Sequence, residues 1–154
     1  MSIAPFVQTP LEVAKKMLDL AQIKPGEVLY DMGCGDGRLI ILAAKEVGAN
    51  ATGIELREDL IERAKTEIKR LNLEDKVRII QGNFFDVNIS DADVVTLYLT
   101  SSANERLRPK LESELKPGSR IVSHDLKVPG WKPIAVYDEL LGHTIYKYRI
   151  GEHI

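Results

Sequence analysis

The chain has 154 residues, of which 44% are hydrophobic and 29% are charged, and its formal net charge at pH 7 is -2. A chain of this length can bury one adequate core, so we expect a single domain over residues 1–154. The 21 basic and 23 acidic side chains nearly cancel. They provide no global basic field for a polyanion, so a nucleic-acid partner is unsupported.

The N-terminal residues lack both the basic and the apolar stretches of a secretory signal, and no apolar run reaches membrane-spanning length. We therefore expect no membrane contact. Cys34 is the single cysteine and cannot form an internal disulfide, which suits a reducing compartment, so the expected location is cytoplasmic. The histidines at 124, 143 and 153 match no familiar ligand spacing, and no metal site is expected.

The spacing of apolar residues predicts alternating helices and strands. In chain order these are a helix after Thr9, capped by Thr9-Pro10; a strand at 27–31; a helix at 37–47; a strand at 51–56; a helix with apolar residues from Leu60 to Leu71; strands at 77–81 and 93–99; a helix or two broken near Pro109; and strands at 120–124, 134–140 and 144–150. This order favours an α/β fold, a mostly parallel seven-stranded sheet with helices on both faces. The last two strands are expected to form an antiparallel C-terminal hairpin.

A glycine-rich run, Gly33-Cys34-Gly35-Asp36-Gly37, follows the first predicted strand and precedes a helix. Glu55 lies at the end of the next predicted strand. A dinucleotide site would have its third glycine at position 38, where this chain has arginine, so the spacing disfavours NAD. No phosphate-binding lysine follows the loop, which disfavours a nucleoside triphosphate.

Glycines at alternate positions let the backbone approach a ligand without interference from Cβ atoms. The loop therefore suits a cofactor whose amino-acid portion lies across it. Glu55 can accept hydrogen bonds from both ribose hydroxyls, and Asp31 can meet the positively charged amino end. The alternative is that the glycines form only a tight turn between strand and helix.

Asn83 and Phe84 follow the third predicted strand, where an adenine could meet a polar side chain and an aromatic face. The alternative is a polar turn beside a core phenylalanine. Cys34 lies near a helix N-terminus, where a thiol can be reactive, but a small buried residue is the favoured interpretation.

With these residues in place, the chain resembles the archaeal broad-specificity protein-lysine methyltransferases and their mitochondrial relatives. The resemblance rests on 31–38, Glu55, 82–85, 94–96, 111–120, 123–125, 130–131, 148–153 and the N-terminal 5–10. It implies a Rossmann-like methyltransferase fold, S-adenosylmethionine as cofactor, and methyl transfer to lysine amines of protein substrates that carry exposed lysines. We expect the enzyme to be monomeric. The cofactor-binding positions it implies, read together with the motifs, are Thr9, Asp31, Gly33, Cys34, Gly35, Glu55, Leu56, Asn83 and Phe84.

The N-terminal segment resembles the family's Pro-Tyr-Val-Pro-Thr-Pro, which implies that residues 1–24 form a lid and a helix. Phe6 departs from the tyrosine and lacks its hydroxyl. Gln8 departs from the second proline and loosens the backbone. Cofactor affinity or lid dynamics can therefore differ from the family's.

The end of the fourth strand, Thr-Leu-Tyr-Leu-Thr at 96–100, is implied to approach the transferred methyl group. Enzymes that methylate exocyclic base amines usually carry Asn-Pro-Pro-Tyr or Asp-Pro-Pro-Tyr there, so base methylation is disfavoured. The candidate catalytic residues are Tyr98, Thr100 and Asp125, which would orient the substrate amine. Tyr98 could instead be a packed strand residue, and His124 and Asp125 could simply cap a strand. An RNA or small-metabolite acceptor, and a non-catalytic cofactor-binding module, remain as alternatives.

Overall fold

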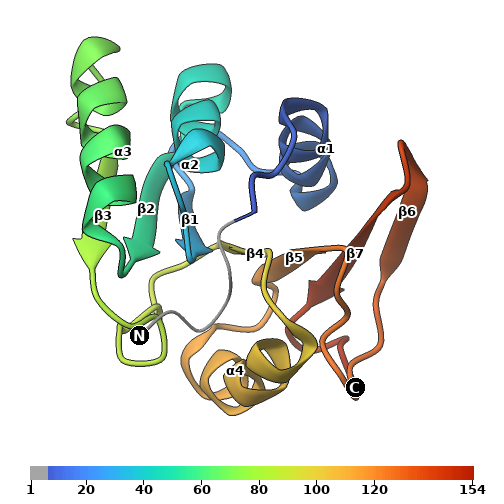
Figure 1. Ribbon diagram of the computed structural model, residues 1–154. Coiled ribbons are helices and arrows are strands. Elements are labelled where there is room, and N and C mark those ends of the chain that lie inside the picture. The colour runs from blue at the N-terminus through green and yellow to red at the C-terminus, as the bar shows by residue number, and fades with distance from the viewer. Residues whose placement is uncertain (1–6) are drawn as a thin grey trace.

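The computed structural model describes residues 7–154. In chain order the elements are α1 (Leu11–Ala21), β1 (Val28–Met32), α2 (Arg38–Leu42), η1 (Ala43–Val47), β2 (Asn50–Glu55), α3 (Glu58–Arg70), β3 (Val77–Gln81), β4 (Val94–Leu97), α4 (Ser101–Glu114), β5 (Arg120–His124), β6 (Ala135–Leu140) and β7 (His143–Arg149). The strands form one sheet in the order β3-β2-β1-β4-β5-β7-β6. Helices cover both of its faces (Figure 1).

Successive residues of the central strands point to opposite faces, and each face has its own apolar core. Leu29 of β1 and Val94 of β4 pack in the core that includes α1 and α2. The next residues along these strands, Tyr30 and Val95, pack in the core that includes α4. Because both faces of the central strands are covered, ligands can reach these strands only at their ends.

The predicted mostly parallel sheet with an antiparallel C-terminal hairpin is confirmed. β1 pairs in parallel with β2 on one side and with β4 on the other, so the order of the strands reverses at β1. β7 runs antiparallel to both β5 and β6. In open α/β sheets, ligands usually bind in the crevice beyond such a reversal. We therefore expect the ligand site at the carboxyl ends of β1 and β4.

One continuous helix, α4, replaces the predicted break near Pro109. Pro109 lies inside this helix and cannot donate the usual hydrogen bond four residues back, at a cost of roughly 3 kcal/mol. Leu107 and Leu111 are both fully buried, and burying two leucines contributes about 3–6 kcal/mol. The packing of this apolar face therefore outweighs the missing hydrogen bond.

The start of α1 and the form of the second predicted helix also differ from the sequence predictions. Pro10, and not Thr9, occupies the cap position of α1, and no side chain of the described part of the chain caps that helix. The single helix predicted over 37–47 is α2 followed by the π-helical stretch η1.

Within residues 7–154, no helix combines the length and the apolar content needed to cross a lipid bilayer.

Candidate active site

A cavity of about 850 Å³, including the space open at its mouth, lies at the carboxyl ends of β1, β2 and β4. Its lining comes from four parts of the sheet edge, from α1 and α2, and from the N-terminal segment: Asp31 and 33–36, 54–57, Gly82 with Phe84, 97–99, Met17, Arg38 with Leu39, and Val7–Thr9. Eight of the nine predicted cofactor residues therefore line one cavity. Asn83 is the exception.

The glycine loop turns sharply between β1 and α2. Gly33, Gly35 and Gly37 all have positive φ angles, in the left-handed region that favours glycine. The backbone amides of Gly33 and Cys34 each donate a 2.9 Å hydrogen bond to the carbonyl of Ile54, which fixes the loop against β2. The loop's backbone thus reaches the cavity in one defined conformation.

Cys34 is packed against β2 beside Gly53. A Cβ atom at Gly53 would lie 2.4 Å from the sulfur of Cys34, so only glycine leaves room for this side chain. Burial raises the pKa of the Cys34 thiol, and the carboxylates of Asp31 and Glu55 add to the effect. The thiol is therefore protonated at neutral pH, which agrees with a small packed residue and not with a nucleophile.

Asp31 is a buried carboxyl group in the wall of the cavity. Its Oδ1 accepts a 2.9 Å hydrogen bond from the hydroxyl of Thr96 on β4. Burial raises the pKa of Asp31 to about 7; the Thr96 hydrogen bond opposes this shift, and the Glu55 carboxylate adds to it. No cation within residues 7–154 offsets the shift. A buried carboxylate of this kind fits a positively charged ligand group.

Glu55 ends β2, and backbone amides hold its carboxylate in place. Oε1 accepts a 2.9 Å hydrogen bond from Gly35 N. Oε2 accepts hydrogen bonds from Leu56 N at 2.9 Å and Arg57 N at 3.0 Å. Each carboxylate oxygen has two lone-pair sites, so Oε1 retains capacity for a further donor. Glu55 is thus fixed in orientation and has one acceptor site left for a hydroxyl group, whereas the sequence predicted hydrogen bonds from both ribose hydroxyls.

The segment Val7–Thr9 lies along the cavity and is attached to the rest of the site through Thr9. The Thr9 carbonyl accepts a 3.3 Å hydrogen bond from Arg38, which also forms a 3.0 Å salt bridge with Asp36. The Thr9 hydroxyl lies 3.4 Å from Nδ1 of His124. The prediction that Phe6 alters this segment falls outside the described residues.

Tyr98 lies just beyond β4 and lines the cavity, so it is not a packed strand residue. Its ring stacks on the imidazole of His124, with 3.8 Å between ring centroids and 30° between ring planes. Burial and the nearby Asp125 carboxylate raise the pKa of Tyr98, so its hydroxyl stays protonated at neutral pH.

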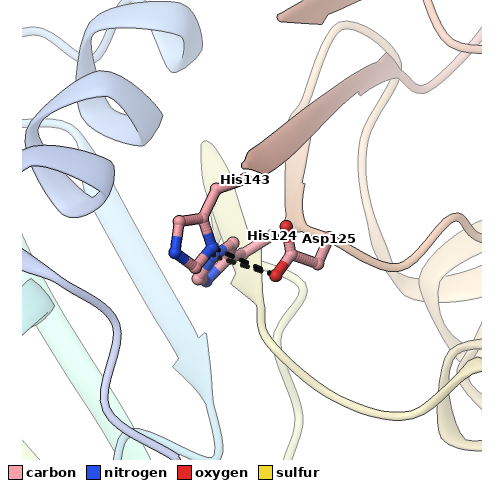
Figure 2. Close-up of side chains that lie close together, drawn as sticks. All are labelled: His124, Asp125 and His143. Atoms are coloured by element: carbon pink, nitrogen blue, oxygen red, sulfur yellow. Dashed lines mark hydrogen bonds and ion pairs between the residues drawn. The ribbon is translucent and has the colours of Figure 1, made fainter. Parts of the chain in front are cut away.

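His124, Asp125 and His143 form a polar cluster (Figure 2), and the ring of His124 lies against Tyr98. Nε2 of His124 lies 2.7 Å from Nδ1 of His143, and Oδ2 of Asp125 lies 3.2 Å from the same Nδ1. Oδ1 of Asp125 accepts a 2.9 Å hydrogen bond from Thr144 N. Burial lowers the pKa of His124 to about 4; Asp125 opposes this shift and His143 adds to it, so His124 is neutral at pH 7.

Two predicted residues have structural hydrogen bonds of their own. Oδ1 of Asn83 accepts from the backbone amide of Phe85 at 2.9 Å. The hydroxyl oxygen of Thr100 accepts from Ala103 N at 3.1 Å and thereby caps α4. Neither side chain lines the cavity, although both lie beside residues that do. Their assigned roles stay predictions.

Arg38 and His143 were not among the predicted site residues. Arg38 occupies the position where a dinucleotide site would have glycine, and this departure was a signal that its side chain has another role. His143 carries no motif of its own. However, residues in strands alternate between faces, and Ile145 pairs with His124, so His143 lies on the same face as His124.

Residues 31–135 match the family model of the ANTKMT methyltransferase domain. A protein-lysine N-methyltransferase of Saccharolobus islandicus (strain REY15A) is 46% identical over 153 residues, which cover 97% of this chain and 95% of that protein. The adenine nucleotide translocase lysine N-methyltransferase of Mus musculus is 33% identical over 136 residues, which cover 88% of this chain and 58% of that protein.

One solved structure is similar over nearly the whole fold. It is the crystal structure of an RNA methyltransferase from Salinibacter ruber in complex with S-adenosyl-L-homocysteine. The two chains are 44% identical with a TM-score of 0.92, and the match covers 96% of each.

Proposed function

The chain belongs to the family of the ANTKMT methyltransferase domain, and from this premise we propose that it transfers methyl groups from S-adenosylmethionine to lysine side-chain amines of proteins. One observation carries the proposal: a single cavity brings together the buried Asp31, the oriented Glu55 and the ring of Tyr98. The first two residues suit the cofactor, and the third lies where an acceptor would approach.

The residues of the cavity fit S-adenosylmethionine. Asp31 is a buried carboxyl group with no cationic partner among residues 7–154, which suits the ammonium end of the cofactor's amino acid. Glu55 can accept a hydrogen bond from a ribose hydroxyl, and Phe84 offers an aromatic side chain for the adenine. When bound, S-adenosylmethionine supplies a methyl group on a positively charged sulfur, which an amine can attack.

A lysine acceptor must first lose a proton. A free lysine has a pKa near 10.4, so neutralising its amine at pH 7 costs about 4.6 kcal/mol. Moving the ammonium into a partly buried site lowers this cost, because burial disfavours the charged form. The pKa of His124 is lowered to about 4, which makes it a weak base, so the protein needs mainly to desolvate and position the amine.

Tyr98 is the residue best placed to orient the amine, since its side chain lines the cavity and its hydroxyl is protonated. We propose the same role for Thr100 and Asp125. Their oxygen atoms already have partners, because Thr100 caps α4 and Asp125 binds Thr144 N. The proposal therefore depends chiefly on Tyr98.

The nature of the acceptor gives the first prediction. Purified enzyme incubated with radiolabelled cofactor and a cell extract should transfer label that protease removes and nuclease does not. Mass spectrometry of a methylated substrate should place the added methyl groups on lysine. Label that survives protease and disappears with nuclease would instead support an RNA acceptor. The similarity to the RNA methyltransferase from Salinibacter ruber is the reason for considering this alternative.

The second prediction tests Tyr98. Tyr98→Phe retains the ring that stacks on His124 but removes the hydroxyl, so turnover should fall by about tenfold, as expected for one lost hydrogen bond of about 1.4 kcal/mol. Cofactor affinity should change by less than about twofold on the same scale. Steady-state kinetics with a lysine substrate and calorimetry with S-adenosylhomocysteine measure the two quantities.

The matched control is Tyr137→Phe, because Tyr137 lies on β6 and does not line the cavity. Its kinetics should match those of the unmodified protein. Equal turnover in Tyr98→Phe and Tyr137→Phe would remove Tyr98 from the proposed role.

We also propose that the enzyme acts as a monomer in the cytoplasm. The free, buried thiol of Cys34 supports a reducing compartment. Sedimentation of the purified protein at micromolar concentrations tests the oligomeric state.

A further inference from the structure

We propose that His124, Asp125 and His143 form a binding site for a divalent transition-metal ion. The ligand atoms would be Nε2 of His124, Oδ2 of Asp125 and Nδ1 of His143, which converge on one another (Figure 2). The sequence predicted no metal site, because the two histidines are 19 residues apart in the chain. The pairing of β5 with β7 brings them together.

The distances between the three atoms suit a metal ion. They are 2.7 Å between the two nitrogens, 3.2 Å from His143 to Asp125 and 3.4 Å from His124 to Asp125. In the plane of the three atoms, the point equidistant from them lies about 1.8 Å from each. This distance is slightly shorter than the bond length of about 2.1 Å typical of zinc. An ion about 1 Å above their plane would therefore contact all three at ordinary bond lengths.

Hydrogen bonds alone cannot satisfy the lone pairs of all three atoms. A neutral imidazole has one N–H and one bare nitrogen, and an ionised carboxylate has only acceptors. Two N–H groups cannot point at each other across 2.7 Å, so at most one proton lies between the two rings. Three lone-pair atoms then share a single hydrogen, whereas one cation would satisfy all of them.

The surroundings of the cluster also resemble those of metal sites. Ligands of a metal are usually oriented by further hydrogen bonds from their other atoms. Oδ1 of Asp125 accepts from Thr144 N, and Nδ1 of His124 lies 3.4 Å from the Thr9 hydroxyl. The His143 and Asp125 side chains are 26% and 29% exposed, which gives an ion a path from solvent and room for water ligands.

Two imidazole nitrogens and one carboxylate oxygen select the class of ion. Imidazole binds Zn²⁺, Fe²⁺, Co²⁺ and Ni²⁺ well, whereas Mg²⁺ and Ca²⁺ prefer sites built from oxygen atoms. Three protein ligands leave open coordination positions for water. We therefore expect Zn²⁺ and Co²⁺ to bind and Mg²⁺ and Ca²⁺ not to bind.

A bound ion would connect this cluster to the cavity. With the metal on Nε2 of His124, the ring proton resides on Nδ1 and can be donated to the Thr9 hydroxyl. His124 also stacks on Tyr98. The ion would in addition compete with a substrate ammonium for Oδ2 of Asp125. The inference does not depend on methyl transfer, because metal binding is measured without cofactor or substrate.

The test uses the full chain without a histidine tag, stripped of metal by a chelator and titrated with Zn²⁺ or Co²⁺ by calorimetry. We expect one equivalent to bind, with Co²⁺ acquiring visible absorption bands from nitrogen and oxygen ligands. His143→Ala and Asp125→Asn should each weaken binding by at least about 100-fold, since loss of supporting residues alone costs roughly 10- to 100-fold. Mg²⁺ should give no signal.

Asp125→Asn also guards against misfolding, because asparagine tolerates the positive φ found at this position. Asp138→Asn is the matched control, because Asp138 lies on β6, in the same hairpin as His143, and its side chain is exposed; this variant should bind the ion as the unmodified protein does. Absence of saturable Zn²⁺ and Co²⁺ binding, or unchanged affinity in folded Asp125→Asn or His143→Ala, would overturn the proposal.

Discussion

Replacing Glu55 by alanine should weaken cofactor binding by roughly 10- to 150-fold, which corresponds to about 1.5–3 kcal/mol for one hydrogen bond from a ribose hydroxyl to a carboxylate. The loss should be large because Glu55 is already oriented by three backbone amides, so little entropy is spent in fixing it for the ligand. Calorimetry with S-adenosylhomocysteine measures the affinity.

The same three amides lose their acceptor in Glu55→Ala, so thermal unfolding must accompany the binding experiment. Gly35 N, Leu56 N and Arg57 N can find water at the cavity wall, and we expect the protein to stay folded with a modest loss of stability. Glu58→Ala is the matched control, since it removes an equal charge from an exposed position nearby in the chain. Unchanged affinity in folded Glu55→Ala would remove the ribose assignment.

The sequence predicts the strand alternation and the glycine loop because both depend on local patterns. The strands at 28–32 and 50–55 are short and mostly buried, and glycines with positive φ mark the turn between the first of them and α2. The position of Glu55 then follows from parallel pairing of β1 with β2. These parts of the site follow from local patterns and from the parallel pairing expected of alternating strands and helices.

Other features depend on contacts that no local pattern contains. The continuity of α4 through Pro109 results from burial of Leu107 and Leu111 against the sheet. The His124–Asp125–His143 cluster requires the antiparallel register of β5 and β7 and the positive φ of Asp125. The role of Thr9 as a contact of His124, and not as a helix cap, likewise depends on where the sheet edge lies.

Asp31 should make cofactor affinity depend on pH. Its pKa in the folded, cofactor-free protein is raised to about 7, chiefly by burial, and an ammonium group binds the ionised carboxylate more tightly than the neutral acid. The affinity for S-adenosylhomocysteine should therefore rise by up to about tenfold per pH unit between about pH 5 and 7, then level off. Asp31→Asn should bind weakly at pH 8 and should lose this dependence.

The same carboxyl group should affect stability in the opposite direction. Because the folded pKa of about 7 lies above the unfolded value of 3.8, the folded state binds more protons between these values. The contribution of Asp31 is thus fully present below about pH 4 and is lost as the pH rises through 7, by at most about 4 kcal/mol. Without cofactor, Asp31→Asn should be more stable than the unmodified protein at pH 8.

Thr96 provides an independent check on the assignment. Its hydroxyl donates to Asp31 and lowers the pKa of that carboxyl group. Thr96→Val should therefore raise the pKa of Asp31 further and shift the midpoint of the affinity profile to higher pH, whereas Asp75→Asn, at an exposed turn, should leave the profile in place. A flat affinity profile in the unmodified protein, or a profile retained in Asp31→Asn, would show that another group recognises the ammonium end. For Asp31→Asn, we expect a gain of stability at pH 8 together with a loss of cofactor binding. That combination would show that the unfavourable burial of this charge serves ligand binding.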